Sequence, residues 1–486
     1  MTTENTKKTR TESDLIGARE VPYEVLYGVQ TLRGMENFPI SHFKLSQYPL
    51  FIKGLGVTKL GAVRANHKLG LIPDDMAKAI EQACLELIEG RHTEAFPVDM
   101  IQGGAGTTTN MNANEVIANR ALELMGCERG DYKRCSPNDH VNRSQSTNDA
   151  YPTAIHIGLY ETHLRLRQHL EQLIEAFEKK AEEFAGVLKM GRTQLQDAVP
   201  MTLGQTFHGF ASILRNELPH LDAAAAEFLV INMGATAIGT GICAEPNYAE
   251  MSTAEIAAIT GYAYRLSDDL VGATSDTSCM AGYSSAMRMV ALKMNKICND
   301  LRLISSGPRC GLGEITLPGV QPGSSIMPGK INPVIPEVMN QIAYKVIGND
   351  LCVSMSSEAA QMELNAMEPV MAQCCFESAD LLMNGFDTLR TRCVDGIIAN
   401  KEACLEHVHR SIGIVTALNP VIGYKNSTRI AKEALETGRS VYDLILEHDI
   451  LSKEDLDTIF RPENLISPVK LDIKPKHYFH SGRAAA

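Results

Sequence analysis

The chain has 486 residues, of which 44% are hydrophobic and 21% charged, close to the averages for globular proteins. Its 46 basic and 58 acidic residues give a formal net charge of −12, which argues against a basic nucleic-acid-binding face. No apolar run reaches the roughly 18 residues that a membrane span requires. We therefore expect a large-cored protein that binds neither nucleic acid nor membrane.

The chain ends and the cysteines indicate the compartment. Residues 1–14 are polar, lack the apolar stretch of a secretory signal and are expected to be disordered, like the tail HSGRAAA. The twelve cysteines include no CxxC pair, so we expect reduced thiols packed as small hydrophobic side chains. These features predict a cytoplasmic protein.

Helical periodicity dominates the middle of the chain. Residues 15–75 mix short apolar runs with turn signals, but from 159 to 188 apolar residues recur at steps of three and four. The same spacing runs over 286–304, and further helical patterns cover about 334–345 and 369–393. Helices of this length bury a stripe against one another, which predicts a helical bundle.

The C-terminal region is built differently. Residues 398–465 are expected to form several short helices, with Ser440 and Ser452 as N-caps and Asp455 at capping-box spacing from Ser452. Strand signals are sparse and do not alternate with helices, which argues against a doubly wound α/β fold. The sequence therefore predicts a mainly α protein.

The helix expected over 286–304 is apolar on more than one face, since Met287, Met289, Leu292 and Leu303 fall off its main stripe. A helix that is apolar all round is usually enclosed. Packing between subunits and burial inside one chain explain the pattern equally well at this stage.

Four polar segments lie between the helical runs, at 103–115, 142–153, 189–205 and 322–333. Three are rich in Gly, Ser, Thr and Asn, which offer many hydroxyl and amide donors and allow close backbone approach. This composition suits a small dianion with two carboxylates. Each segment taken alone is more typical of helix caps and turns, but four such segments in one chain favour a binding site.

The segment 322–333 has the most chemical content, because Ser324, Ser325, Lys330 and Asn332 occur together on it. A serine that acts as a base needs its alkoxide stabilised. A lysine about 4 Å away at an effective dielectric of about 20 supplies roughly 4 kcal/mol, and backbone N–H groups add to it. Proton abstraction by Ser324 is therefore a chemically reasonable hypothesis.

Other motif interpretations fail. GSSIMPGKI has one residue too many for a phosphate-binding P-loop and lacks the Ser or Thr after the lysine. The GxGxxA match at 239–244 has no strand–turn–helix pattern around it, so dinucleotide binding is rejected. No HExxH or similarly spaced cluster occurs among the fourteen histidines, so no metal site is expected.

The motif GSSIMPGKINP resembles the signature loop of the fumarase/aspartase superfamily, and the resemblance extends from LIGAREVPYEVLYGVQTLRGMENF to TALNPVIGY. It implies three mainly helical domains, here 1–143, 144–397 and 398–486. The long central helices would form a twenty-helix core in a homotetramer. It also implies active sites that are each built from three subunits.

Within the superfamily, GGAGTTTNMN, SQSTNDAYPT and NPVIPEVMNQ are similar to the aspartase branch. Fumarases typically carry a histidine after GRT, paired with a glutamate; here Glu337 is present but Gln194 takes the histidine's place. A neutral amide does not shuttle a proton as imidazole does. Because an amine leaves already protonated, Gln194 favours deamination of L-aspartate to fumarate and ammonia.

The resemblance also implies individual roles. Ser324 would take the proton beside the β-carboxylate, giving an aci-carboxylate intermediate. The β-carboxylate would be bound by Thr107, Ser146, Thr147 and Ser325. The α-carboxylate would be bound by Thr193, Lys330 and Asn332, with Asn148 near the amino group.

The resemblance implies no required cofactor, with a divalent cation such as Mg²⁺ as a candidate activator. A class II fumarase acting on L-malate is the alternative within the same chemistry. A structural relative without activity is the alternative outside it, although such a protein has no need to keep Ser324, Lys330 and Asn332.

Overall fold

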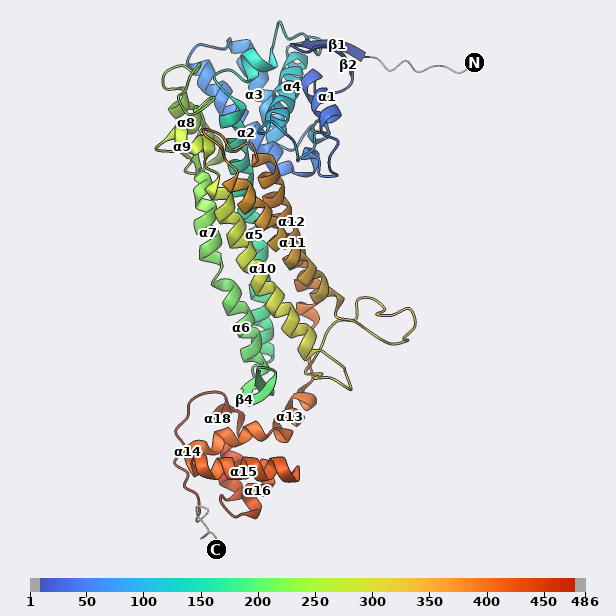
Figure 1. The fold of residues 1–486 in the computed structure, drawn as a ribbon, viewed down its shortest axis with the longest axis vertical. Coiled ribbons are helices and arrows are strands. Elements are labelled where there is room, and N and C mark those ends of the chain that lie inside the picture. The colour runs from blue at the N-terminus through green and yellow to red at the C-terminus, as the bar shows by residue number, and fades with distance from the viewer. Residues whose placement is uncertain (1–8, 477–486) are drawn as a thin grey trace, which may run out of the picture. The chain divides into compact units, whose positions relative to one another are not determined.

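The computed structural model describes residues 9–476, and these are mainly helical, which confirms the predicted fold class (Figure 1). The helices are α1 (Val29–Asn37), α2 (Pro49–Lys68), α3 (Asp74–Ile88), α4 (Thr107–Leu124), α5 (Thr147–Glu183), α6 (Leu203–Arg215), α7 (Leu218–Ala226), α8 (Tyr248–Thr260), α9 (Leu270–Ser275), α10 (Ser278–Ile304), α11 (Val334–Glu358), α12 (Glu368–Arg392), α13 (Lys401–Arg410), α14 (Asn419–Ile422), α15 (Tyr424–Thr437), α16 (Val441–Glu447), α17 (Lys453–Ile459) and α18 (Pro462–Leu465).

The strands of the described residues form four two-stranded sheets. The strands are β1 (Thr9–Asp14), β2 (Gly17–Pro22), β3 (Leu188–Thr193), β4 (Gln196–Thr202), β5 (Val230–Ile231), β6 (Arg265–Leu266), β7 (Ile315–Thr316) and β8 (Ile398–Ala399). Three pairs are antiparallel and β5–β6 is parallel. The parallel pair β5–β6 is connected through α8, but strands of two residues build no doubly wound sheet within the described residues, in agreement with the rejection of that fold.

The predicted long helices are present as α5, α10, α11 and α12. Only the end of the first pattern is wrong, because Leu188 lies in β3 rather than in a helix. Leu188 is buried because it packs against the C-terminal helices. It therefore continues the apolar spacing of the helix in the sequence without being part of that helix. Of the four off-stripe residues of α10, Met287 is buried while Met289, Leu292 and Leu303 are exposed.

The chain divides into two compact units. The first comprises residues up to 168, 217–292 and 342–384, and one of its cores joins α2 and α8 with the start of α5. The second comprises 169–216, 293–341 and the chain from 385 onward. Because both units combine separate stretches, the three-domain boundaries at 143 and 397 stay a prediction.

The region 15–75 is more helical than the sequence indicated, since α2 spans twenty residues. Fourteen of them are buried, so α2 shows no single apolar stripe. Its glycines permit close packing: a Cβ on Gly54 would lie 2.2 Å from the Ala154 carbonyl oxygen of α5. Enclosure on all sides removes the periodic signal that a surface helix displays.

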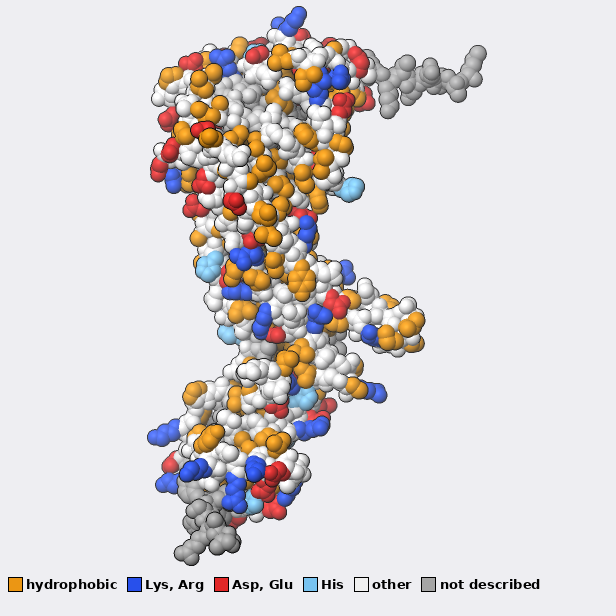
Figure 2. Space-filling view, in the orientation of Figure 1, with side chains coloured by type: hydrophobic (Ala, Val, Ile, Leu, Met, Phe, Trp, Pro, Cys, Tyr) orange, Lys and Arg blue, Asp and Glu red, His pale blue; other side chains and the backbone are white. Residues whose placement is uncertain are grey.

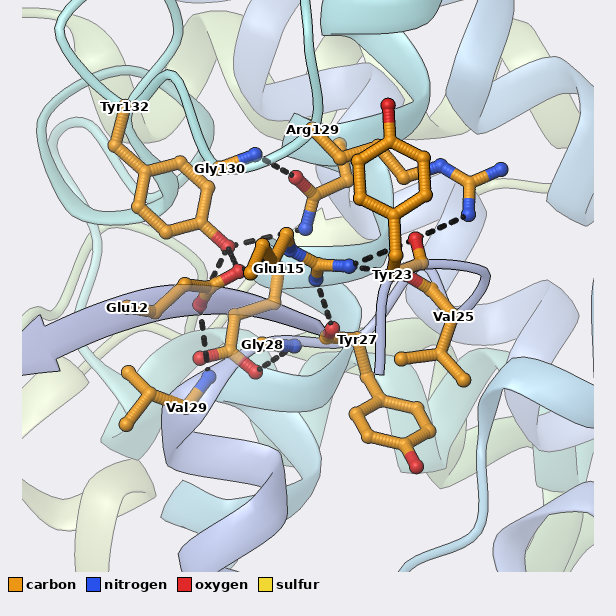
Figure 3. Close-up of polar contacts among 12 residues, drawn as sticks. Glu12, Tyr23, Val25, Tyr27, Gly28, Val29, Glu115, Arg129, Gly130 and Tyr132 are labelled. Atoms are coloured by element: carbon orange, nitrogen blue, oxygen red, sulfur yellow. Dashed lines mark hydrogen bonds and ion pairs between the residues drawn. The ribbon is translucent and has the colours of Figure 1, made fainter. Parts of the chain in front are cut away.

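The expectation of disorder over residues 1–14 is wrong for Thr9–Asp14, which pair with β2; the remainder, and the tail HSGRAAA, lie outside the described residues. The buried Arg10 guanidinium donates to four backbone carbonyls between residues 22 and 27. The carboxylates of Glu12 and Glu115 point toward the backbone N–H groups of Val29 and Gly28 (Figure 3). Burial of these charges with their partners orders the strand.

The side chain of Glu115 caps the N-terminal end of α1. Its carboxylate accepts hydrogen bonds from the backbone N–H groups of Gly28, Gln30 and Thr31 at 2.8–3.1 Å and from the Thr31 hydroxyl at 2.6 Å. Together with Glu12, it satisfies four backbone donors that a helix start leaves free. Gly28 is required here because a Cβ would lie 2.5 Å from Glu12 Oε2.

In the second unit, β3 and the short helices after α13 share one apolar core. The N-cap predictions are confirmed, since Ser440 Oγ accepts from the Asp443 N–H and Ser452 Oγ from the Asp455 N–H. The Ser452 hydroxyl also donates to the Asp455 carboxylate at 2.6 Å. Local capping chemistry thus sets where these two short helices begin.

Candidate active site

In the first unit, α4 begins at Thr107 after a tight glycine turn. Gly104, Ala105 and Gly106 all have positive φ. A Cβ on Gly106 would lie 2.4 Å from the Tyr151 ring, so only glycine fits this close approach. The Thr107 hydroxyl is exposed and donates to the Gly104 carbonyl at 2.8 Å. The predicted carboxylate ligand therefore stands at a helix N-terminus, where anions are favoured.

Ser146 lies immediately before α5, whose first residue is Thr147. Ser146 Oγ accepts from the Asn148 N–H at 3.2 Å, and its own N–H donates to Asp149 at 2.9 Å. The buried Asp149 also accepts from the Gly234 and Thr236 N–H groups at 3.0 and 2.9 Å. Burial raises the pKa of Asp149 to about 6, against the effect of these N–H donors. Asp149 thereby fixes the start of α5 to residues 234–236.

Asn148 is held by the same segment. The side-chain NH2 of Asn148 donates to the Ala237 backbone carbonyl at 2.8 Å, and the backbone carbonyl of Asn148 accepts from the side-chain NH2 of Asn232 at 3.1 Å. The side chain remains half-buried with its oxygen available as an acceptor. That acceptor suits the ammonium group that the sequence assigned to this position.

A buried lysine that the sequence analysis missed links α4 to α5. Lys59 Nζ donates to the side-chain oxygens of Asn110, Asn142 and Gln145 at 2.7, 3.0 and 2.8 Å. Asn110 in turn donates to Thr147 Oγ1 at 3.1 Å. Burial lowers the pKa of Lys59 to about 7. No local pattern marks Lys59, because its partners lie 51 and more residues away.

In the second unit, Ser324 lies on the loop between β7 and α11. Its Oγ accepts from the backbone N–H groups of Ile326 and Met327 at 3.2 and 3.0 Å. These donors are backbone N–H groups of the kind expected from the sequence, and they would stabilise a negative charge on the Ser324 oxygen. No bond joins Ser324 Oγ to Lys330 Nζ among the described residues, so the expected effect of Lys330 on Ser324 stays a prediction.

The ends of this loop are fastened to each other. The Gly323 N–H donates to the Lys330 carbonyl at 2.8 Å, and the Asn332 side-chain amide donates to the Gly323 carbonyl at 2.7 Å. A Cβ on Gly323 would lie 2.6 Å from the Lys330 oxygen. The loop therefore brings Ser324, Lys330 and Asn332 onto one exposed turn, with the side chain of Ile326 84% exposed beside them. Ser325 is exposed on the same turn.

Thr193 is placed on a separate element of the second unit. It ends β3 and pairs with Gln196, and the two residues between them, Gln194 and Leu195, have positive φ. Thr193 is exposed at the tip of this hairpin. Gln194, which the sequence analysis contrasted with the fumarase histidine, therefore lies directly beside the predicted carboxylate ligand.

The predicted residues thus form two sets. One unit holds Thr107, Ser146, Thr147 and Asn148, the other Thr193, Ser324, Ser325, Lys330 and Asn332. Within residues 9–476, no three His, Cys, Asp or Glu side chains are arranged to hold a metal ion. In the same range, no helix is both long and apolar enough to cross a membrane.

Comparison with known families gives two matches. Residues 17–348 match the family described as Lyase, and residues 414–467 match the family described as Fumarase C C-terminus. The first match covers the glycine turn before α4, the start of α5, the β3–β4 hairpin and the Ser324 loop, so every predicted site residue falls within it.

Comparison with individual proteins agrees. The chain is 55% identical to an aspartate ammonia-lyase of Pseudomonas aeruginosa, over 94% of this chain and 97% of that protein. A crystal structure described as fumarate lyase:delta crystallin from Brucella melitensis bound to cobalt is 48% identical, with a TM-score of 0.92 over 95% of this chain and all of that one. A class II fumarase of Schistosoma mansoni is 32% identical, with a TM-score of 0.87 over 94% of this chain and 98% of that one.

Proposed function

The chain belongs to the fumarase/aspartase superfamily of lyases, and we propose that it catalyses the reversible deamination of L-aspartate to fumarate and ammonia. The observation that carries the choice is the much higher identity to aspartate ammonia-lyase than to fumarase, over nearly the whole chain. Gln194 at the hairpin tip supports it, because an amide cannot pass a proton to a leaving hydroxide.

In this proposal, hydroxyl groups at two helix N-termini bind the β-carboxylate. Thr107 is the first residue of α4, and Ser146 and Thr147 stand at the start of α5. Helix N-termini favour anions because their backbone N–H groups are free and the helix dipole is positive there. Ser325 completes this set from the exposed loop. The α-carboxylate is bound by Thr193, Lys330 and Asn332, and the amino group lies near Asn148.

Ser324 acts as the base. Its Oγ takes the proton from the carbon beside the β-carboxylate, and the electron pair of that C–H bond moves into the carboxylate, giving the aci-carboxylate. As this charge returns to form the carbon–carbon double bond, the C–N bond breaks and its electron pair leaves with nitrogen as ammonia. The N–H groups of Ile326 and Met327 support the alkoxide form of Ser324, and one such donor is typically worth about 3–4 kcal/mol.

The active unit is a homotetramer in which three subunits contribute to each site. Exposed apolar side chains on two long helices support this proposal: Leu351 and Met355 of α11 are 62% and 63% exposed, and Met289 and Leu292 of α10 are also exposed. Apolar side chains also gather along the helical part of the face drawn in Figure 2. Contiguous exposed apolar surface marks an interface. Light scattering in solution should give a tetramer, and a monomer would contradict the shared site.

The enzyme is expected to be cytoplasmic and to need no cofactor, with a divalent cation such as Mg²⁺ as an activator rather than a reactant. Dialysis against a chelator should therefore lower the rate without abolishing it. Complete loss of activity, restored by Mg²⁺, would show that the metal is required.

The decisive assay follows fumarate by ultraviolet absorbance after the purified protein is given L-aspartate or L-malate. We expect fumarate from L-aspartate, with an equal amount of ammonia. Fumarate from L-malate alone would select the class II fumarase alternative, and no product from either would favour a structural relative.

Two variants test the assigned roles. Ser324→Ala should abolish turnover and leave the tetramer intact, whereas Ser305→Ala, a serine outside the loop, should retain wild-type rates. Lys330→Ala should chiefly raise the KM for L-aspartate. Near-normal turnover by Ser324→Ala would remove the base from this mechanism.

A further inference from the structure

The buried lysine of the first unit, Lys59 on α2, forms no ion pair among the described residues. Its side chain is 0% exposed, and its Nζ donates to the side-chain oxygens of Asn110, Asn142 and Gln145 at 2.7, 3.0 and 2.8 Å. An ammonium group has three N–H donors and no acceptor, so all of its donors are used. Burying such a group without an ion pair is unfavourable, so a lysine is a poor choice here for packing alone.

Lys59 determines which way the three amides around it are turned. A half-turn of a side-chain amide exchanges its oxygen with its NH2 group. Because Lys59 only donates, all three oxygens must face it and the NH2 groups must face elsewhere. The Gln145 NH2 donates to the Val141 backbone carbonyl at 2.9 Å, and the Asn142 NH2 donates to the Gln145 backbone carbonyl at 3.2 Å. These two bonds hold the turn that comes directly before α5.

The third amide, that of Asn110, carries the effect of Lys59 to Thr147. Its NH2 donates to Thr147 Oγ1 at 3.1 Å and to Asn142 Oδ1 at 3.2 Å. The Thr147 hydroxyl therefore acts as an acceptor toward Asn110, and within the described residues its own O–H donates to no group. The hydroxyl proton is thus left free for an acceptor that binds at the start of α5.

We propose that Lys59 is a positioning residue of the β-carboxylate subsite: it orients the surrounding amides so that Thr147 accepts from Asn110 and donates to the carboxylate. This inference rests on the proposed function and deepens it. The three residues belong to the first unit, so one subunit brings them together to the shared site. Lys59 does not touch the substrate. Its effect is largest when the aci-carboxylate forms, because a fixed donor is worth most where charge develops.

The test compares kcat and KM for L-aspartate in Lys59→Met, Thr147→Val and the double variant of the intact enzyme. Lys59→Met keeps a long unbranched side chain and removes all three donors. Thr147→Val removes a donor to the developing charge and should lower kcat by about 10²- to 10³-fold. Lys59→Met should lower kcat by about ten- to a hundredfold, with a smaller change in KM. Because Lys59 acts through Thr147, the double variant should be no worse than Thr147→Val alone.

A second variant and two inhibitors separate positioning from a general loss of structure. Asn110→Leu keeps Lys59 and its charge but breaks the contact with Thr147, and should lower kcat by about tenfold or more. The nitronate of 3-nitropropionate has the charge distribution of the aci-carboxylate, so its affinity for Lys59→Met should fall by the same factor as kcat/KM. Succinate resembles only the substrate, and its affinity should fall by less than about threefold.

Three results would overturn the proposal: a kcat within about twofold of wild type in folded Lys59→Met, a wild-type kcat in Asn110→Leu, or kcat losses that multiply in the double variant. The second result would leave Lys59 as a remote charge or a packing residue. If Lys59→Met fails to fold, Asn110→Leu or the smaller Asn110→Ala decides. A lowered kcat in that variant supports the proposal, and a wild-type kcat refutes it.

The control is Lys53→Met, which removes another lysine of α2, one that pairs with Glu161 at 2.6 Å. Its kcat and its affinity for the nitronate should equal those of wild type. Failure of the proposed function is seen separately, in the wild-type enzyme. If wild type acts on L-malate instead, the same variants are measured on L-malate, and if it is inactive on both, the affinity for the nitronate replaces kcat.

Discussion

Replacing Glu368 by glutamine should remove the part of the pH dependence of the free energy of unfolding that is due to the titration of Glu368. Glu368 begins α12, is 3% exposed, and its carboxyl forms no ion pair or hydrogen bond within the described residues. It lines a cavity together with Pro152, His156 and Cys279. Burial, with no opposing partner, raises the pKa of Glu368 from 4.5 to about 8.

The sign follows from proton binding. Between pH 4.5 and about 8, the folded protein holds a proton on Glu368 that the unfolded chain has lost. Unfolding then releases a proton, so the free energy of unfolding falls as the pH rises through this window. Each pH unit is worth about 1.4 kcal/mol per chain, so the whole interval removes as much as roughly 5 kcal/mol.

Urea unfolding, followed by circular dichroism from pH 5 to 9 at one protein concentration, measures this. Glu368→Gln has the shape of the protonated acid and does not titrate, so it should match wild type at pH 5 and exceed it progressively toward pH 8. The difference between the two curves isolates Glu368 from other groups that titrate in the same range. Glu363→Gln, an exposed neighbour, is the control and should parallel wild type. Parallel curves for Glu368→Gln would refute the reasoning.

Two further predictions concern the site loop and the start of α1. Gly323→Ala places a Cβ 2.6 Å from the Lys330 oxygen and should disturb the contacts between the two ends of the loop. The variant should have a lower kcat/KM for L-aspartate with little change in Tm, because the loop is exposed. Unchanged kinetics would show that the contacts between the loop ends are not needed. Glu115→Gln turns a side-chain NH2 toward the partly buried backbone N–H of Gln30 in α1, and should reduce the free energy of unfolding by about 2–3 kcal/mol in urea titrations. A loss below about 0.5 kcal/mol would contradict that account.

The sequence predicted those parts of the fold whose signal is local. The helices α5, α10, α11 and α12 show a sustained period because one side of each faces a core, and Ser440 and Ser452 cap their helices through residues only three positions away. By contrast, α2 was missed because burial on nearly every side removes the periodic contrast. The strand Thr9–Asp14 was missed because Arg10 and Glu12, read singly, look solvated.

The same distinction applies to the candidate site. The segments carrying Thr107, Thr147 and Ser324 stand out by composition, since glycine turns and hydroxyl groups occur together there. The residues that hold those segments in place are Lys59, Asp149 and Glu314. Lys59 and Glu314 are single charges within unremarkable local sequences, and Asp149, although it belongs to the polar segment 142–153, has partners at 234 and 236; the distant pairings of all three lie far along the chain. One sequence carries no record of such pairings, and only the folded chain shows them.

The cap on α1 has a consequence for how the protein is made. Gly28 receives its acceptor from Glu115, which lies 87 residues later. At about 5 to 20 residues per second on the ribosome, α1 exists for roughly 4 to 17 seconds before that acceptor is synthesised. A nine-residue helix is too short to persist alone in water. In the nascent chain, α1 therefore becomes stable only after α4 has been synthesised.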